Sequence, residues 1–186
     1  MKLDVLTREQ CQQVRGWRNT ELQFLRTPYL ITEQMQDEFY DNVINNRDSK
    51  HRYFALIEMV ERDHVSLCSK TKRWLPTTMD KIFIGMGGLT NIEWENGTAE
   101  ISLIINPEYR GKGYGKKAVD LLLDEAFKNM RLYSVYGEVY NCGNRGFWVK
   151  MVNKKGGYKT DLKYRKFYNG EMLDSIWFAF KKEDKK

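Results

Sequence analysis

The sequence predicts a mixed α+β fold, with a central and mostly antiparallel sheet flanked by about four helices. Apolar runs of strand type occupy residues 52–60 and 99–105. The pairs Asn96-Gly97 and Asn169-Gly170 are strong signals for tight turns between antiparallel strands. Residues 119–130 carry apolar side chains at helical spacing along one face. Hairpins combined with a long amphipathic helix are typical of helices packed against such a sheet.

The N-terminal third predicts one short strand and two helices. Residues 2–6 form the strand, and a helix begins after Thr7, because Thr7 and Gln10 are spaced as a capping box. Thr32 caps a second helix. Its apolar residues recur four apart, at Met35, Phe39 and Val43.

Residues 61–80 form a polar excursion between two strong strands, the second of them at 81–92. The excursion is longer than a tight hairpin needs. Connections of this length often carry function, so a substrate-facing lid and a plain hairpin extension both stay open.

The C-terminal half predicts a strand over 132–140, a helix over 144–155 that Gly156-Gly157 stops, and two final strands. No internal repeat and no linker marks a second domain. We therefore expect a single domain over residues 1–180, followed by a charged tail at 181–186.

Composition narrows the class of protein. No apolar run is long enough to span a membrane, and the N-terminus lacks the apolar core of a signal peptide, so we expect a cytoplasmic protein without a membrane partner. Cys11, Cys68 and Cys142 are scattered and without metal spacing, which predicts free thiols. His51 and His64 also lack neighbours at ligand spacing, so we expect no metal.

The charge distribution does not require a nucleic-acid partner. The formal net charge is +6, and residues 150–186 hold 11 basic and 5 acidic side chains, which accounts for the excess. No helix carries a continuous basic face, so a solvated C-terminal region is the simpler interpretation.

The segment PEYRGKGYGKK, residues 107–117, predicts an anion-binding loop. It joins a buried strand to the start of the amphipathic helix, where unpaired N–H groups and a partial positive charge are available. Glycines let the backbone approach a ligand, while Arg110, Lys112 and Lys116 add formal charge. Together these features describe a cradle for a phosphate or diphosphate.

Two familiar phosphate loops do not fit this segment. A P-loop and a dinucleotide fingerprint, each counted from Gly111, both require glycine at position 116, which is lysine here. The spacing R-x-x-G-x-G, with Arg110, Gly113 and Gly115, does fit. It is the acyl-coenzyme A (CoA) loop of the GNAT superfamily of N-acetyltransferases.

AEISLIINPEYRGKGYGKKAVDLLLDEAF, residues 99–127, resembles the central motif of that superfamily along its whole length. The order of predicted elements matches too, and the resemblance covers nearly the whole chain except residues 61–80 and the tail. GGYKTDLKYRKFYNGEMLDSIWFAF, residues 156–180, resembles the RimJ/RimL-like branch, and VRGWRN, residues 14–19, resembles amino-sugar and RimJ/RimL-like members.

The resemblance implies how acetyl-CoA is held. The strands before and after the loop-helix unit would splay apart, and pantetheine would enter the gap. Backbone groups of Leu103, Ile104 and Ile105 would pair with pantetheine, and an N–H of Ile104 or Ile105 would stabilise the oxyanion. The other expected cofactor-binding residues are Arg110, Gly111, Lys112, Gly113, Tyr114, Gly115, Lys116 and Asn144.

The implied reaction is direct transfer of acetyl to a primary amine through a tetrahedral intermediate, without a metal or an acyl-enzyme. A neutral amine is required, so a general base is useful. Glu100, on the strand that leads into the gap, is the first candidate. Glu138, on the strand across the gap, is the second; an exposed strand glutamate is the alternative interpretation.

The general acid departs from the family pattern. Members often use a helix tyrosine, but its position falls here at Met151 or Asn153. Tyr140, Cys142 or solvent would then protonate the leaving thiolate.

The acceptor is predicted only by class. Arg26, Tyr29 and Trp74 are expected to line its site, and aromatic with cationic groups suit a nucleotide-linked amino sugar. A protein N-terminus is the other favoured acceptor, while a polyamine would prefer a clearly acidic pocket. A non-catalytic acyl-CoA sensor, an RNA-borne amine and a homodimer all stay open.

Overall fold

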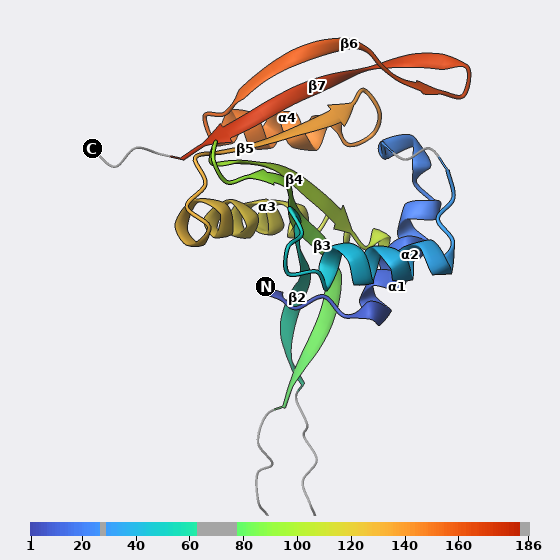
Figure 1. The fold of residues 1–186 in the computed structure, drawn as a ribbon, viewed down its shortest axis with the longest axis vertical. Helices are drawn as coiled ribbons and strands as arrows, with labels where there is room; N and C mark the ends of the chain where they lie inside the picture. Colours follow the sequence, from blue (N-terminus) through green and yellow to red (C-terminus); the bar gives the residue numbers. More distant parts are fainter. Residues whose placement is uncertain (27–28, 63–77, 183–186) are drawn as a thin grey trace, which may run out of the picture.

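The computed structural model describes residues 1–26, 29–62 and 78–182, and within them it contains one seven-stranded sheet in the order β1-β2-β3-β4-β5-β7-β6 (Figure 1). Every neighbouring pair is antiparallel except β4 and β5, which are parallel. The predicted mixed, mostly antiparallel sheet is confirmed. The strands are β1 Lys2–Asp4, β2 Arg52–Arg62, β3 Thr78–Glu93, β4 Thr98–Ile105, β5 Ser134–Tyr140, β6 Tyr158–Tyr168 and β7 Glu171–Lys181.

The described residues contain four α-helices, which confirms the predicted number. They are α1 Arg8–Asn19, α2 Glu33–Phe39, α3 Tyr114–Asp124 and α4 Arg145–Lys154. Short 3₁₀ turns occur at η1 Leu22–Phe24 and η3 Pro107–Tyr109, and π-helical turns extend α2 and α3 at η2 Tyr40–Ile44 and η4 Glu125–Asn129. None of the described helices is long and apolar enough to cross a membrane.

The predicted helix starts are confirmed by their hydrogen bonds. The Thr7 side chain accepts from the Gln10 N–H, and the Gln10 side chain accepts from the Thr7 N–H, so the capping box is complete. The Thr32 side chain accepts from the Met35 N–H at the start of α2. Local sequence is sufficient here because a cap involves residues only three apart.

Helices cover both faces of the strands β2 to β4 (Figure 1). Ala55 and Ile57 of β2 pack with α1 residues such as Val14. Leu56, which alternation directs to the other face, packs with Ala118 of α3. A strand covered on both faces needs apolar side chains on both, which explains the nearly continuous apolar run in β2 that the sequence shows.

The turns follow their predicted positions. Asn169 and Gly170 both adopt positive φ (49° and 84°), as the tight β6–β7 turn requires. Asn96-Gly97 lies in a four-residue connection between Glu93 and Thr98, with Gly97 at φ 64°.

Strands β2 and β3 extend into the predicted polar excursion and pair as far as Arg62 and Thr78. The remainder of the excursion, with the predicted lid, Trp74 and Cys68, lies outside the described residues.

The sheet opens between β4 and β5. Their pairing is limited to Thr98 with Ser134, Ala99 with Val135, and Glu100 with Tyr136. Beyond this fork, β4 continues to Ile105 beside β3, while β5 continues to Tyr140 beside β7. The predicted splay is therefore present, and among the described strands none pairs with the backbone groups of β4 that face the gap.

Candidate acyl-transfer site

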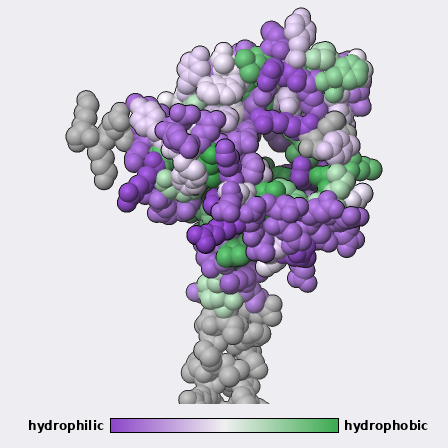
Figure 2. All heavy atoms as spheres, in the orientation of Figure 1, coloured by the Kyte–Doolittle hydropathy of each residue, from purple (hydrophilic) through white to green (hydrophobic). Residues whose placement is uncertain are grey.

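A cavity of about 740 Å³ fills the gap between the splayed strands. We call the part beside the loop 110–116 its loop end, and the part beside Glu100 its fork end. In the space-filling view the molecule is hollowed between its upper part, with β6 and β7, and its lower part, with α1 and α2 (Figure 2). Apolar surface lies within the hollow and hydrophilic side chains surround it.

At the loop end the backbone forms an anion cradle. Gly111 and Gly113 adopt left-handed φ values of 73° and 83°, which explains the need for glycine at both positions. The first helical bond of α3 runs from the Lys117 N–H to the Gly113 carbonyl (3.3 Å). The N–H groups of residues 114–116 precede it and point out of the helix start, where they and the dipole favour an anion.

Arg110 connects this loop to β4 and to the α1–α2 connection. Its Nε donates to the Ile105 carbonyl (3.1 Å), and its Nη1 donates to Glu21 (2.5 Å). The Asn106 N–H donates back to the Ile84 carbonyl of β3 (2.9 Å). By strand alternation the Ile104 N–H also points toward β3, so the N–H groups of Leu103 and Ile105 point into the gap.

Glu100 lies at the fork itself and is only 8% exposed. Its carboxylate accepts two bonds from the Arg26 guanidinium, one of them 3.0 Å long, and one from the Asn91 side chain (2.9 Å). A buried carboxylate is stable only with such partners. Glu100 therefore holds a cation at the point where the strands part.

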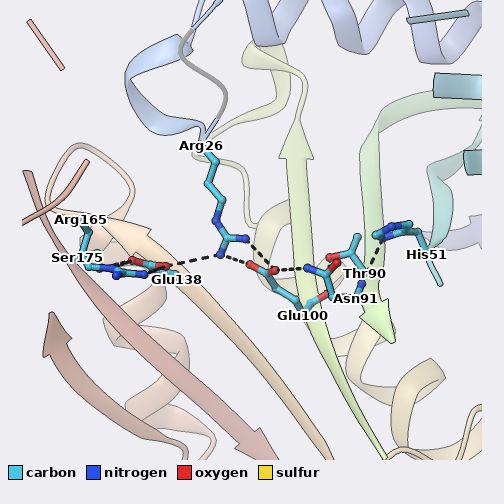
Figure 3. A network of polar contacts seen from close by, with 8 residues as sticks. All are labelled: Arg26, His51, Thr90, Asn91, Glu100, Glu138, Arg165 and Ser175. Atoms are coloured by element: carbon cyan, nitrogen blue, oxygen red, sulfur yellow. Dashed lines mark hydrogen bonds and ion pairs between the residues drawn. The ribbon is translucent and has the colours of Figure 1, made fainter. Parts of the chain in front are cut away.

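Arg26 also links the two strands across the gap, as Figure 3 shows. Its Nη2 lies 3.7 Å from Glu138 on β5. Glu138 additionally accepts from Arg165 (3.0 Å) and Ser175 (2.6 Å). Burial raises the pKa of Glu138, but the bonds from Arg165 and Ser175 outweigh it and lower that pKa below its usual value.

Beyond Glu100 the polar network continues to His51 (Figure 3). The Asn91 N–H donates to His51 Nδ1 (3.2 Å), and Thr90 Oγ1 donates to the Glu100 carbonyl (3.2 Å). Asn91 adopts φ 48°, a left-handed conformation that asparagine tolerates. Burial and nearby Arg52 lower the pKa of His51, which favours a neutral ring.

Lys166 positions the turn that carries Arg26. Its ammonium reaches from β6 to the carbonyls of Leu22 (2.8 Å) and Gln23 (3.1 Å), and also to that of Leu25. It lies over the ring of Tyr140 at 5.2 Å. Tyr140 lines the cavity, and burial raises the pKa of its hydroxyl, so the group keeps its proton at neutral pH.

Helix α4 gives the cavity Asn144, Phe147 and Trp148. Met151, one position where the family pattern places a tyrosine, is buried in the core at 4% exposure. The described part of the helix therefore directs no tyrosine into the cavity.

Most of the predicted site residues come together around this cavity. Those that line it are Arg26, Glu100, Leu103, Ile104, Ile105, Arg110, Gly111, Gly113, Gly115, Lys116, Glu138, Tyr140 and Asn144. Three others do not. Lys112 lies over the Tyr109 ring, Tyr114 packs edge-on against Tyr109, and Tyr29 is 56% exposed.

Sequence reasoning missed several polar cavity residues. Asn91 and His51 line the fork end, Arg18 also lines the cavity, and Arg165 and Ser175 bond to Glu138. Their roles depend on contacts between distant segments, and no local motif marks them. The sequence contained one clue to Asn91. A hairpin around Asn96-Gly97 places residues near 90 opposite residues near 100, as the pairing of Thr90 with Glu100 does.

Comparison with known proteins identifies a family. A family model described as an acetyltransferase (GNAT) domain matches residues 5–145. The chain is 26% identical over 150 residues to a prophage-derived uncharacterized N-acetyltransferase, YokL, of Bacillus subtilis, covering 80% of this chain and 83% of that protein. It is 25% identical over 150 residues to the spermidine N(1)-acetyltransferase of Escherichia coli, covering 77% and 80%.

Solved structures share the fold. The spermidine N-acetyltransferase of Vibrio cholerae in complex with CoA and spermine superposes with a TM-score of 0.75 at 20% identity, covering 97% of this chain and 94% of that one. A point mutant of that Vibrio cholerae enzyme gives a TM-score of 0.73 at 22% identity, with 97% and 95% covered.

Proposed function

The chain belongs to the GNAT acetyltransferase family, and from this premise we propose that it acetylates the primary amine of a small molecule at the fork of β4 and β5. As a family member it is an acyl-CoA-dependent N-acetyltransferase with acetyl-CoA as its co-substrate. The observation that carries the acceptor position is Glu100, a buried carboxylate at the fork that already binds the Arg26 cation.

The residues of the loop end fit acetyl-CoA. The N–H groups at the start of α3, with Arg110 and Lys116, would hold the diphosphate. The gap-facing N–H of Ile105, at the loop end, would pair with a pantetheine amide, because no described strand pairs with it. The cofactor would then lie along β4 with its thioester directed toward the fork.

Three groups would perform the transfer. Glu100 takes the proton of the acceptor ammonium, directly or through water, and the neutral amine attacks the thioester carbonyl. The gap-facing N–H of Leu103, which lies nearer the fork than that of Ile105, stabilises the oxygen of the tetrahedral intermediate. Tyr140, which keeps its proton at neutral pH, donates a hydrogen bond or a proton to the departing thiolate.

Glu138 would act as a fixed anion rather than as the base. Hydrogen bonds from Arg165 and Ser175 lower its pKa, so it accepts a proton poorly near neutral pH. Its charge would help to hold a cation between the two strands, as it holds Arg26 now.

A polyamine is the acceptor class that the relatives support, since two of the named proteins are described as spermidine N-acetyltransferases. Glu21, Glu100 and Glu138 line the cavity and would attract a polycation. Each is already paired with an arginine, however, so a polyamine would have to displace Arg26 or Arg110. A RimJ/RimL-like role, with a protein N-terminus as acceptor, rests only on the resemblance of residues 156–180 and 14–19.

Glu100→Gln tests the proposal. We expect acetyl-CoA-dependent thiol release to fall about 100- to 10,000-fold with the accepted amine, because the base is lost while the shape is kept. CoA affinity should stay unchanged. Glu95→Gln, which removes an exposed carboxylate from the β3–β4 connection, is the matched control and should retain full activity.

The acceptor panel consists of polyamines, nucleotide-linked amino sugars, and short peptides with free N-termini. Turnover of one class above the background without acceptor names that class. An unchanged rate in Glu100→Gln across pH would remove Glu100 as the base. Binding of CoA without turnover of any amine would favour the acyl-CoA sensor instead.

A further inference from the structure

One cation in the cavity has no counterion among the described residues. Arg18, on the last turn of α1, lines the cavity, and its Nε is buried without a hydrogen-bond partner. Within residues 1–26, 29–62 and 78–182 no acidic side chain forms an ion pair with it. Burial lowers the pKa of Arg18, and the groups that oppose this effect are Tyr53, Cys11 and Tyr29, none of which is an anion at neutral pH.

The other arginines of the cavity differ from Arg18. Arg26 forms two bonds to Glu100, and Arg110 is held by Glu21 and the Ile105 carbonyl. Burial of a guanidinium nitrogen without a partner is costly, and an incoming anion that pairs with Arg18 would offset that cost. Arg18 is therefore prepared for a negative group that the described part of the protein does not itself supply.

Arg18 lies near the reacting end of the cavity. It interacts electrostatically with Tyr53, which in turn interacts with Glu100 at the fork. Burial raises the pKa of Tyr53 to about 12, so its hydroxyl stays neutral and can donate a hydrogen bond. Phe39 packs edge-on against Tyr53 at 5.3 Å, and His51 stacks on it at 6.4 Å. An anion beside these rings would be shielded from water, which strengthens its attraction to Arg18.

We propose that Arg18 binds an acidic group, a carboxylate or a phosphate, on the same small molecule whose amine is acetylated beside Glu100. The acceptor would thus be an amino acid or an amino phosphate rather than a simple polyamine. This inference rests on the proposed function, because it takes the fork as the position of the reacting amine.

A matched pair of probes tests this inference. Butane-1,4-diamine and 4-aminobutanoate both have four carbons, and the second has a carboxylate in place of one aminomethyl group of the first. Glucosamine and glucosamine 6-phosphate form the corresponding pair for a phosphate. Binding of each is measured by calorimetry with CoA present, and acetylation is measured separately with acetyl-CoA.

We expect the native chain to bind the acidic member of at least one pair more tightly than the non-acidic member of that pair. Arg18→Met should weaken that binding about 10- to 100-fold and leave the non-acidic member unchanged, because one charge-assisted contact is lost. Arg18→Lys should retain part of the affinity, and Arg18→Glu should favour the diamine. Arg15→Met is the matched control, since Arg15 lies on the same helix, bonds to Gln12 and does not line the cavity.

Several results would overturn the inference. These are binding of none of the four probes, equal binding by the native chain and Arg18→Met, or a preference of the native chain for the diamine. A fall in CoA affinity in Arg18→Met as large as that in Arg110→Glu would assign Arg18 to the cofactor. Failure of the proposed function gives a different result. An acidic probe would then bind in a manner that depends on Arg18, as the calorimetry shows, but would not be acetylated.

Discussion

At the scale of single residues, the site depends on the ion pairs that Arg26 forms with two carboxylates, Glu100 and Glu138. Glu100 accepts hydrogen bonds from both terminal nitrogens of Arg26, while Glu138 accepts mainly from Arg165 and Ser175. The two glutamates lie on strands that part at Glu100, so Arg26 is the link across the opening. An acceptor cation must enter this same position and share or replace the guanidinium.

Removing Arg26 should lower the stability of the fold. In Arg26→Met the buried Glu100 carboxylate loses its counterion, so we expect the free energy of unfolding to fall by about 1–3 kcal/mol. Urea unfolding measures this loss. A stability equal to that of the native chain would show that Arg26 does not compensate the Glu100 charge.

Ser175 should stabilise the fold only while Glu138 is ionised. The pKa of Glu138 is lowered below its ordinary value of 4.5, so the stabilisation is present above that pH and disappears as the pH falls through the folded-state pKa. Ser175→Ala should therefore cost about 1–2 kcal/mol at pH 7 and less at pH 3. Urea unfolding at both values measures the difference, and a cost independent of pH would contradict the charge linkage.

At the scale of elements, the loop before α3 and the fork of β4 form the cofactor part of the site. Gly111 and Gly113 permit the left-handed turn, and α3 then packs Ala118, Val119 and Leu122 against the sheet. Burial of that helix face fixes the direction of its N-terminus toward the gap. The anion cradle is therefore a consequence of core packing as well as of its own sequence.

Arg110→Glu should abolish CoA binding without unfolding the chain. The change places a negative charge in the diphosphate cradle and leaves the buried face of α3 intact, so we expect affinity to fall at least about 100-fold. Calorimetry with CoA measures the loss, and circular dichroism checks the fold. Lys112→Glu is a useful comparison, because Lys112 does not line the cavity and should have a smaller effect.

At the scale of the whole molecule, the open fork leaves two parts of the sheet joined by few contacts. Strands β1 to β4 pair continuously on one side and β5 to β7 on the other, while β4 and β5 share three residue pairs. A cofactor that lies in the gap would contact both parts and connect them. This arrangement predicts a marked effect of CoA on stability.

CoA at 100 times its Kd should stabilise the native state by about 2.7 kcal/mol. For a chain of this size that corresponds to a rise in Tm of roughly 5–10 °C. Thermal unfolding followed by fluorescence measures the rise, and Arg110→Glu should show a rise of at most about 2 °C at the same CoA concentration. A rise of equal size in Arg110→Glu would indicate that CoA binds elsewhere.

Features that depend on neighbouring residues could be predicted from the sequence. The cap at Thr7, the turn at Asn169-Gly170, the apolar face of α3 and the glycine loop each involve residues a few positions apart, where local preference decides the structure. The hairpin turns predicted a mostly antiparallel sheet, and the resemblance to the family implied its fork. The described structure confirms both.

The polar network and the unpaired cation depend instead on how distant segments pack. Arg26 and Glu100 are 74 positions apart, and Lys166 reaches Leu22 across 144 positions. No periodicity connects such residues, because their contact follows from the packing of η1 and β6 around the cavity. The sequence around Arg18 is that of an ordinary helix. Folding buries its Nε without a hydrogen-bond partner among the described residues, and that property made Arg18 a candidate for recognition of the acceptor.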